Sequence, residues 1–300
     1  DFEHRIEGND HGQQHSINIP NIPEILLDNT DRNRTSPFAF TGNKFEFRAV
    51  GSSDNCSSAM VVLNTIVANQ LTEFKKKVDA QIALGVAKED AIEAELREIL
   101  TSSKNIIFGG NGYSDEWVTE AARRGLSNVK NTAEALQAYL NPQSVKLFTE
   151  NGIFSHKELE ARTEIRYETY VLSLELEAKV LTEMIQTFVI PSAIKYQGRI
   201  AKGLSDMKNV GIETSLMTAQ MDLLRTLSSL INSAQQLNHN LMEANEKALA
   251  KEHASDRALA FNNTIKPLFE ELRLVSDEIE RLCDDADWTL PKYRELLTLS

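Results

Sequence analysis

The C-terminal part of the chain contains no glycine: none occurs between Ile212 and Ser300. Two apolar series in this stretch recur with alternating spacings of four and three residues. The series are Leu223, Leu227, Leu230, Ala234, Leu237, Leu241, Ala244 and Ala248, then Phe261, Ile265, Leu268, Leu272, Val275, Ile279, Leu282 and Ala286. A sustained repeat of this kind is typical of long helices that pack along a seam at a small crossing angle. The short polar link at 252–256 predicts an antiparallel, coiled-coil-like hairpin.

In the rest of the chain the residue pattern changes from one region to the next. Residues 1–55 hold three of the seven prolines and short alternating runs such as Phe45 and Phe47, which predict strands and loops. A largely buried helix is predicted over 61–74 and an amphipathic one over 87–103. We therefore expect an α+β fold that is predominantly α, with a few N-terminal strands followed by long packed helices.

Two sequence signals predict where further helices begin and end. Ser114 is a suitable N-cap for a helix that reaches Arg124 and is closed by Gly125. Ser155 and Glu158 have the spacing of a capping box, which predicts the start of a long helix. We expect that helix to run to about residue 189, where Pro191 stops or kinks it.

Composition excludes several classes of function. The formal net charge is −12, which disfavours binding to nucleic-acid phosphates. No apolar run approaches the roughly 20 residues of a membrane helix. The two cysteines, Cys56 and Cys283, are too few for a disulfide framework and suit a reducing cytoplasm. The chain starts at Asp1 and not at Met, so we expect it to be cut from something longer.

One segment, residues 31–48, combines four cations and two anions inside this acidic chain. Side chains alternate faces along a strand, so Lys44, Glu46 and Arg48 share one face. Phe45 and Phe47 share the other face, which we expect to point into the core. The charged row has two interpretations: a salt-bridged surface strand, or a carboxylate that binds a divalent metal while the cations meet phosphate or carboxylate oxygens.

The same segment resembles the type III branch of the glutamine synthetases. Residues 33–48, Asn-Arg-Thr-Ser-Pro-Phe-Ala-Phe-Thr-Gly-Asn-Lys-Phe-Glu-Phe-Arg, are similar to the signature of that branch almost letter for letter. The resemblance runs from about residue 29 to the C-terminus. It is carried further by residues 49–53, 62–68, 110–117, 160–162, 190–193 and 288–297.

The resemblance implies an enzyme of nitrogen assimilation that makes glutamine from glutamate, ammonia and ATP through a γ-glutamyl phosphate. It implies Mg²⁺ or Mn²⁺ as cofactor and a homo-oligomer of stacked hexameric rings. Residues 1–150 then correspond to the C-terminal part of the catalytic domain, with strands of its barrel, and 151–300 to a type III helical region. The other metal ligands and the nucleotide loop are expected upstream of Asp1, so the chain alone is expected to be inactive.

The resemblance also assigns roles to four residues. Glu46 matches a metal-binding glutamate, and Arg48 matches an arginine that meets the substrate glutamate. Arg34 matches an arginine that contacts the transferred phosphate of ATP. Lys44 falls where shorter-subunit classes carry an ATP-contacting arginine, a weaker match because lysine is a point charge. A further arginine of those classes is absent, since 36–43 contain no cation.

A rival hypothesis is that the chain is a helical scaffold or assembly module, because the two seams alone carry no chemistry. Both hypotheses are compatible in part, since the seams can build an oligomer around catalytic strands. Asp284, Asp285 and Asp287 are interpreted as a solvated or subunit-contact cluster, with a calcium site as the alternative.

Overall fold

The computed structural model describes residues 14–15, 25–26, 38–40, 44–48, 55–108 and 111–297. The chain divides into two compact units, and each is described here by itself. The first unit is Asp1–Val129 with Lys146–Ser155, and the second is Lys130–Val145 with His156–Ser300.

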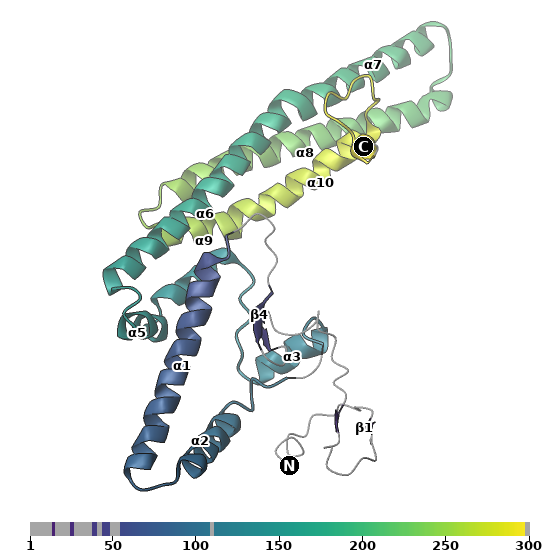
Figure 1. Ribbon diagram of the computed structural model, residues 1–300. Coiled ribbons are helices and arrows are strands. Elements are labelled where there is room, and N and C mark those ends of the chain that lie inside the picture. The colour runs from purple at the N-terminus through teal and green to yellow at the C-terminus, as the bar shows by residue number, and fades with distance from the viewer. Residues whose placement is uncertain are drawn as a thin grey trace. The chain divides into compact units, whose positions relative to one another are not determined.

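The first unit contains two short antiparallel strand pairs and several helices (Figure 1). Its elements are β1 (Gln14–His15), β2 (Ile25–Leu26), β3 (Phe38–Phe40), β4 (Phe45–Phe47), α1 (Ser57–Ala83), α2 (Lys88–Ser102), α3 (Asp115–Arg123) and the last residues of α5 (Pro142–Glu150). Helix α2 packs along α1 and buries Ala91 and Glu95. The Lys77 ammonium of α1 lies 2.7 Å from the Glu95 carboxylate, so the buried charge is paired.

The expectation of a largely buried helix over 61–74 is wrong. Within α1 only Thr65 and Val78 are buried, while Ile66 and Leu71 are exposed. Helix α2 covers one side of α1 and Asn151 donates a hydrogen bond to Asn69 at 2.9 Å, but these contacts leave much of the helix surface in contact with solvent. The amphipathic pattern over 87–103 is confirmed as α2.

The predicted cap of the third helix is confirmed. The Ser114 hydroxyl accepts a hydrogen bond from the Trp117 backbone N–H at 3.2 Å. Gly125 follows the helix with a φ of 77°, the left-handed conformation that glycine adopts without a steric penalty. Both predicted ends of α3 therefore agree with the structure to within about one residue.

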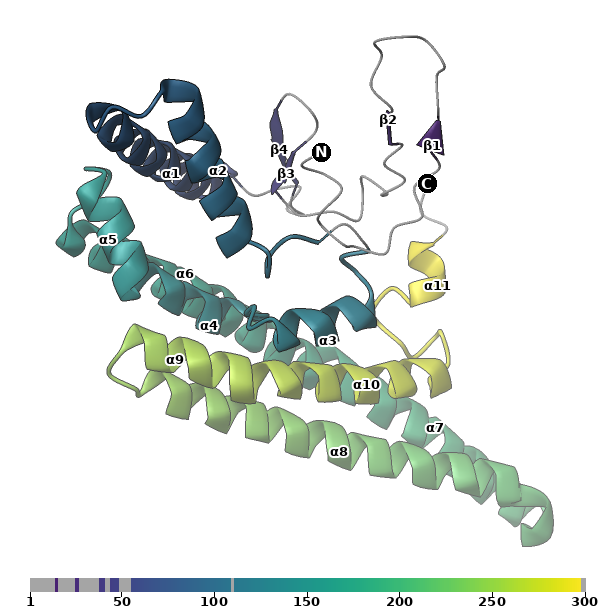
Figure 2. The ribbon, with the colours of Figure 1, turned by 90° about the horizontal axis from the view of Figure 1, so that it is seen from below.

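The second unit is built on long helices that lie side by side (Figures 1 and 2). Its elements are α4 (Thr132–Ala135), η3 (Leu136–Leu140), the start of α5, α6 (His156–Met184), η4 (Ile185–Val189), α7 (Ile190–Asn209), η5 (Thr214–Met217), α8 (Thr218–Leu249), α9 (Ala254–Ala260), η6 (Phe261–Ile265), α10 (Lys266–Leu282) and α11 (Tyr293–Leu296). The run α6–η4–α7 and the run α9–η6–α10 point the same way, and α8, which lies between them in the sequence, is antiparallel to both.

The core of this unit combines most of the two apolar series with buried residues of α6, η4 and α7 such as Val171, Ile185 and Ala193. Helix α8 packs along α10 and α7, and α6 packs along α9. The fully buried side chains of this core include Leu227, Ala234, Leu241, Phe261, Ile265, Leu272 and Ile279. The two predicted helices and the short link between them are present, and the predominantly α fold is confirmed. A coiled-coil geometry of the pair stays a prediction.

Pro191 does not stop the long helix that begins at His156. A π-helical turn, η4, precedes α7, and Pro191 occupies the first turn of α7. Proline has no N–H to donate, and the wider π turn accommodates that loss without ending the helix. The helical path therefore continues from His156 to Asn209.

None of the helices in the described ranges is both long enough and apolar enough to cross a membrane.

Candidate functional site

The predicted site residues lie on a two-stranded antiparallel hairpin, β3–β4. Its register pairs Phe38 with Phe47, Ala39 with Glu46 and Phe40 with Phe45. Alternation along β4 places Lys44, Glu46 and Arg48 on one face, as the sequence predicts. The structure thus brings three of the four candidate residues together.

These three side chains form an ion-paired row centred on Glu46. The Arg48 guanidinium donates to Glu46 Oε2 through Nη2 at 2.7 Å and through Nε at 3.1 Å. Lys44 Nζ lies 3.5 Å from Glu46 Oε1. Both carboxylate oxygens therefore face a cation, one at hydrogen-bond distance and one slightly beyond it.

The hydrogen bonds from Arg48 hold the pKa of Glu46 below its ordinary value, with Lys44 adding to the effect. Partial burial acts in the opposite direction and is outweighed. Glu46 is therefore a carboxylate at neutral pH, the form in which it can bind a cation.

The opposite face of β4 differs from expectation. Phe45 is 54% exposed and Phe47 is 37% exposed, so the prediction that this face lies in the core is wrong. The Phe45 ring stacks on Phe38 with 4.7 Å between ring centroids. A hairpin of two short strands buries little surface by itself, because burial requires a further layer packed on its face.

The described residues fit one ligand of a metal site and not a whole site. Mg²⁺ and Mn²⁺ require several oxygen ligands, and the hairpin offers the single carboxylate of Glu46. No group of three or more His, Cys, Asp or Glu in the described ranges could hold a metal ion. Arg34 lies outside the described residues.

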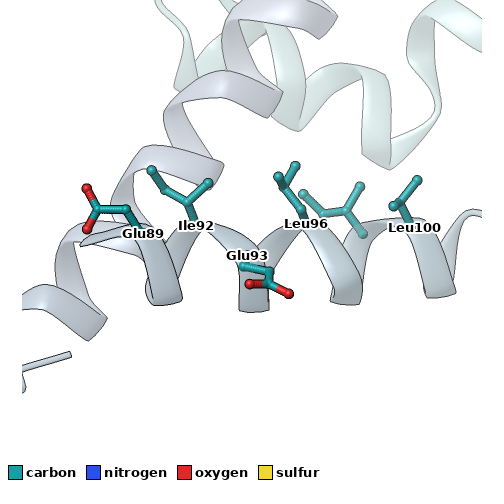
Figure 3. Close-up of a pocket in the computed structure, with 6 residues that line it drawn as sticks. Glu89, Ile92, Glu93, Leu96 and Leu100 are labelled. Carbon is teal, nitrogen blue, oxygen red and sulfur yellow. The ribbon is translucent and has the colours of Figure 1, made fainter. Parts of the chain in front are cut away.

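A stripe on α2 lines a shallow hollow of about 300 Å³ (Figure 3). Ile92, Leu96 and Leu100 project to one side of the helix, and Glu93 points away from them. Apart from Glu89 and Glu93 its lining is aliphatic, which offers no acid–base pair or nucleophile. The hollow is therefore an uncovered apolar surface and not a second active site.

Similarity to known proteins identifies the family of the chain. A model of the glutamine synthetase C-terminal domain family matches residues 91–208. Glutamine synthetase of Bacteroides fragilis is 43% identical over 284 residues, and the type-3 glutamine synthetase of Dictyostelium discoideum is 36% identical over 290 residues. The chain belongs to the glutamine synthetase family.

Both of these glutamine synthetases match over 94% of the chain, and the chain spans 39% of the length of each. A third glutamine synthetase, from Butyrivibrio fibrisolvens, is 33% identical over 275 residues and matches 90% of the chain. The chain thus corresponds to a portion of these proteins, and the family-model match places that portion in their C-terminal part.

The aspartate cluster near the C-terminus of the chain is paired with cations. Arg199 on α7 lies 2.8 Å from Asp284 and 3.2 Å from Asp287. Lys195 lies 3.3 Å from Asp287, and Lys292 lies 2.9 Å from Asp285. The pairs of Arg199 and Lys195 attach the C-terminal segment to α7, and the pair of Lys292 with Asp285 lies within that segment; sequence reasoning missed both. The basic residues Lys292 and Arg294, just beyond the cluster, were the available signal.

Proposed function

We propose that this chain is part of a subunit that ligates ammonia to glutamate at the expense of ATP, through a γ-glutamyl phosphate. The observation that carries the proposal is the Lys44–Glu46–Arg48 row on β4, in a chain that is 43% identical to a named glutamine synthetase. Phosphoryl transfer needs positive charge around the moving phosphate and an ionised carboxylate for the metal, and this row supplies both kinds of group.

The three side chains take different tasks in this proposal. Glu46 contributes one carboxylate to a site for Mg²⁺ or Mn²⁺, whose other ligands come from outside the described residues. When bound, the metal neutralises phosphate charge. Arg48 turns its planar guanidinium toward the carboxylate of substrate glutamate, because two parallel N–H donors match two carboxylate oxygens. Lys44 and Arg34 place positive charge near the phosphates of ATP.

The ion pairs within the row support these assignments. Arg48 and Lys44 neutralise Glu46 when no ligand is bound, so the carboxylate is never left alone in a partly buried position. Binding of a cation to Glu46 competes with Arg48 and makes its guanidinium available to an anion. Metal and substrate are therefore expected to promote each other's binding at this strand.

The proposal extends to the setting of the enzyme. We propose a role in cytoplasmic nitrogen assimilation and a homo-oligomer of stacked hexameric rings, in which helices of the second unit contribute contacts. The rival hypothesis of a scaffold remains compatible with the helical unit, and it interprets the charged row as salt bridges on a surface strand.

The test is γ-glutamyl transfer from glutamine to hydroxylamine, which needs nucleotide and divalent metal, measured on the 300-residue chain and on the longer product of its gene. We expect activity in the longer product alone, because one carboxylate does not make a metal site. An assembled, folded longer product without activity would refute the ligase proposal and favour the scaffold.

A further inference from the structure

The second unit has a groove that the proposed chemistry does not use. It lies between the end of α6 with η4 on one wall and α10 on the other, and the C-terminal segment closes one end. Its volume is about 680 Å³. The lining residues are Glu177, Leu181, Met184, Ile185, Val189, Phe269, Glu270, Arg273, Ser276, Asp277, Glu280, Trp288, Leu290, Pro291, Tyr293 and Leu296.

The floor of this α6–α10 groove is apolar. Ile185, Val189 and Trp288 are buried beneath it, which makes the floor part of the core of the unit. Met184 and Leu296 stand beside them and are exposed. An apolar floor with exposed apolar side chains along it is typical of a surface that another molecule covers.

The rim of the groove is acidic. Four carboxylates, those of Glu177, Glu270, Asp277 and Glu280, face a single cation, Arg273. Asp277 accepts a hydrogen bond from the Tyr293 hydroxyl at 3.2 Å and lies 3.7 Å from Arg273. Glu280 accepts from the Tyr293 backbone N–H at 2.9 Å.

The other two carboxylates differ from this pair. Glu177 and Glu270 are exposed, and no described residue forms an ion pair or hydrogen bond with either side chain. They come from opposite walls, one from α6 and one from α10. Two free carboxylates on opposite sides of an apolar floor complement a ligand that is apolar in the middle and positively charged along its edges.

The groove is held in shape without a ligand. Lys292 Nζ donates to the Cys283 carbonyl at 2.6 Å and pairs with Asp285 at 2.9 Å. Together with the pair between Arg199 and Asp284, these contacts fix the segment that closes the end of the groove. A preformed surface of this kind binds with little ordering cost.

We propose that the α6–α10 groove binds a basic amphipathic helix of another polypeptide. The α6–η4 wall from Glu177 to Val189 is about 18 Å long at 1.5 Å per residue, which accommodates about three turns of a bound helix. Apolar residues at i, i+3, i+4 and i+7 of the partner meet the floor, and its Lys or Arg residues meet Glu177 and Glu270. A small molecule fits less well, because such ligands are enclosed over most of their surface, whereas the rim residues here are exposed.

Trp288 provides a direct measurement, because it lies in the floor. The chain has two tryptophans, so Trp117→Phe leaves Trp288 as the only indole emitter. The probe is a synthetic Leu/Lys peptide of about 18 residues with leucine on one helical face. We expect saturable binding with a change in Trp288 emission, and no binding of a peptide of the same composition with scrambled order.

The charge-reversal variant Glu177→Lys with Glu270→Lys should weaken peptide binding by about tenfold or more, since two attractive contacts become repulsive. Glu164→Lys is the matched control, because Glu164 is an exposed carboxylate of α6 outside the groove. We expect its affinity to stay within twofold, and circular dichroism checks that both variants are folded. Equal binding by the double variant and the control would overturn the proposal.

A second measurement distinguishes a foreign helix from a second copy of this chain. Sedimentation of the chain without peptide should give the same association state for the parent and for the double variant. Self-association that the double variant abolishes would show that a second copy occupies the groove, and would overturn the proposal as stated. Binding of the scrambled peptide with equal affinity would also overturn it, because it would show non-specific attraction of cations.

Discussion

The β3–β4 hairpin and the helical core of the second unit use the same kinds of residue to opposite effect. In the hairpin the rings of Phe45 and Phe47 are exposed and the ion pairs form the candidate site. In the helical core the apolar side chains are completely buried and the ion pairs attach one segment to another. We therefore expect the helical unit to depend on its own contacts for stability, and the exposed hairpin to contribute little to it. The predictions below test this contrast.

The largest expected effect is on the helical core. Phe261→Ala removes a side chain with no exposed surface and should lower the free energy of unfolding by about 3–5 kcal/mol. Phe45→Ala in the hairpin removes a ring of the same size that is half exposed, and should lower it by less than about 1 kcal/mol. Urea denaturation followed by circular dichroism measures both. Equal losses of unfolding free energy in the two variants would show that the hairpin and the helical core do not differ in this way.

The next effect concerns activity. Glu46→Ala in the longer protein should reduce metal-dependent γ-glutamyl transfer by at least about a hundredfold, because a charged metal ligand is lost. The unfolding midpoint should not change, since the carboxylate belongs to a partly exposed row. Wild-type turnover in this variant would refute the metal role of Glu46.

The variant Arg48→Lys tests the proposed contact between Arg48 and the substrate glutamate. Lysine keeps the charge but loses the two parallel donors, so the KM for glutamate should rise by about tenfold while stability is unchanged. Steady-state kinetics at saturating ATP measures this change. An unaltered KM would count against a contact between Arg48 and the substrate.

A smaller effect is expected from the ion pairs of the helical unit. Arg199→Ala leaves the buried carboxylate of Asp287 with Lys195 alone and should cost about 1–3 kcal/mol of stability. Arg225→Ala breaks an exposed pair with Asp222 and should cost less than about 0.5 kcal/mol. If thermal unfolding shows the same loss for both, the attachment of the C-terminal segment does not depend on Arg199.

The smallest effect is a shift in titration. The pKa of Glu46 is lowered in the folded chain, chiefly by hydrogen bonds from Arg48, so the pair is fully formed above the unfolded value. Its contribution is lost as the pH falls through the lowered folded value. Carboxyl NMR of Arg48→Gln should show the Glu46 midpoint moving upward toward 4.5, the ordinary value. An unmoved midpoint would show that the hydrogen bonds do not control this titration.

Local patterns predicted local structure well. The cap at Ser114, the helix over 87–103 and the shared face of Lys44, Glu46 and Arg48 all depend on residues close together in sequence. Burial depends on partners far away, which no pattern in α1 or β4 identifies. The exposed Leu71 and Phe45 are therefore the places where sequence reasoning was wrong.

The failures in the second unit have a different origin. Pro191 was expected to stop or kink the helix; the stop is wrong because the helical path continues past it, and the π turn that precedes Pro191 has no sign in the sequence. The acidic groove was missed because Glu177 and Glu270 are far apart in the chain. Only the packing of α6 and α10 places them on opposite walls of one groove. The role of Arg34 rests on resemblance alone, since it lies outside the described residues.

The π turn at Ile185–Val189 changes the direction in which the side chains of the following helix point. It holds one residue more than a regular turn, which rotates every later side chain by about 100° around the helix axis. Before it the long helix packs chiefly along α9 and also against α8, and after it along α8. A deletion of one residue there would restore regular winding yet point Ser192 and Ala193, both buried, in a new direction. The chain therefore tolerates a change in helix length at this position only if the packing of α7 on α8 changes with it.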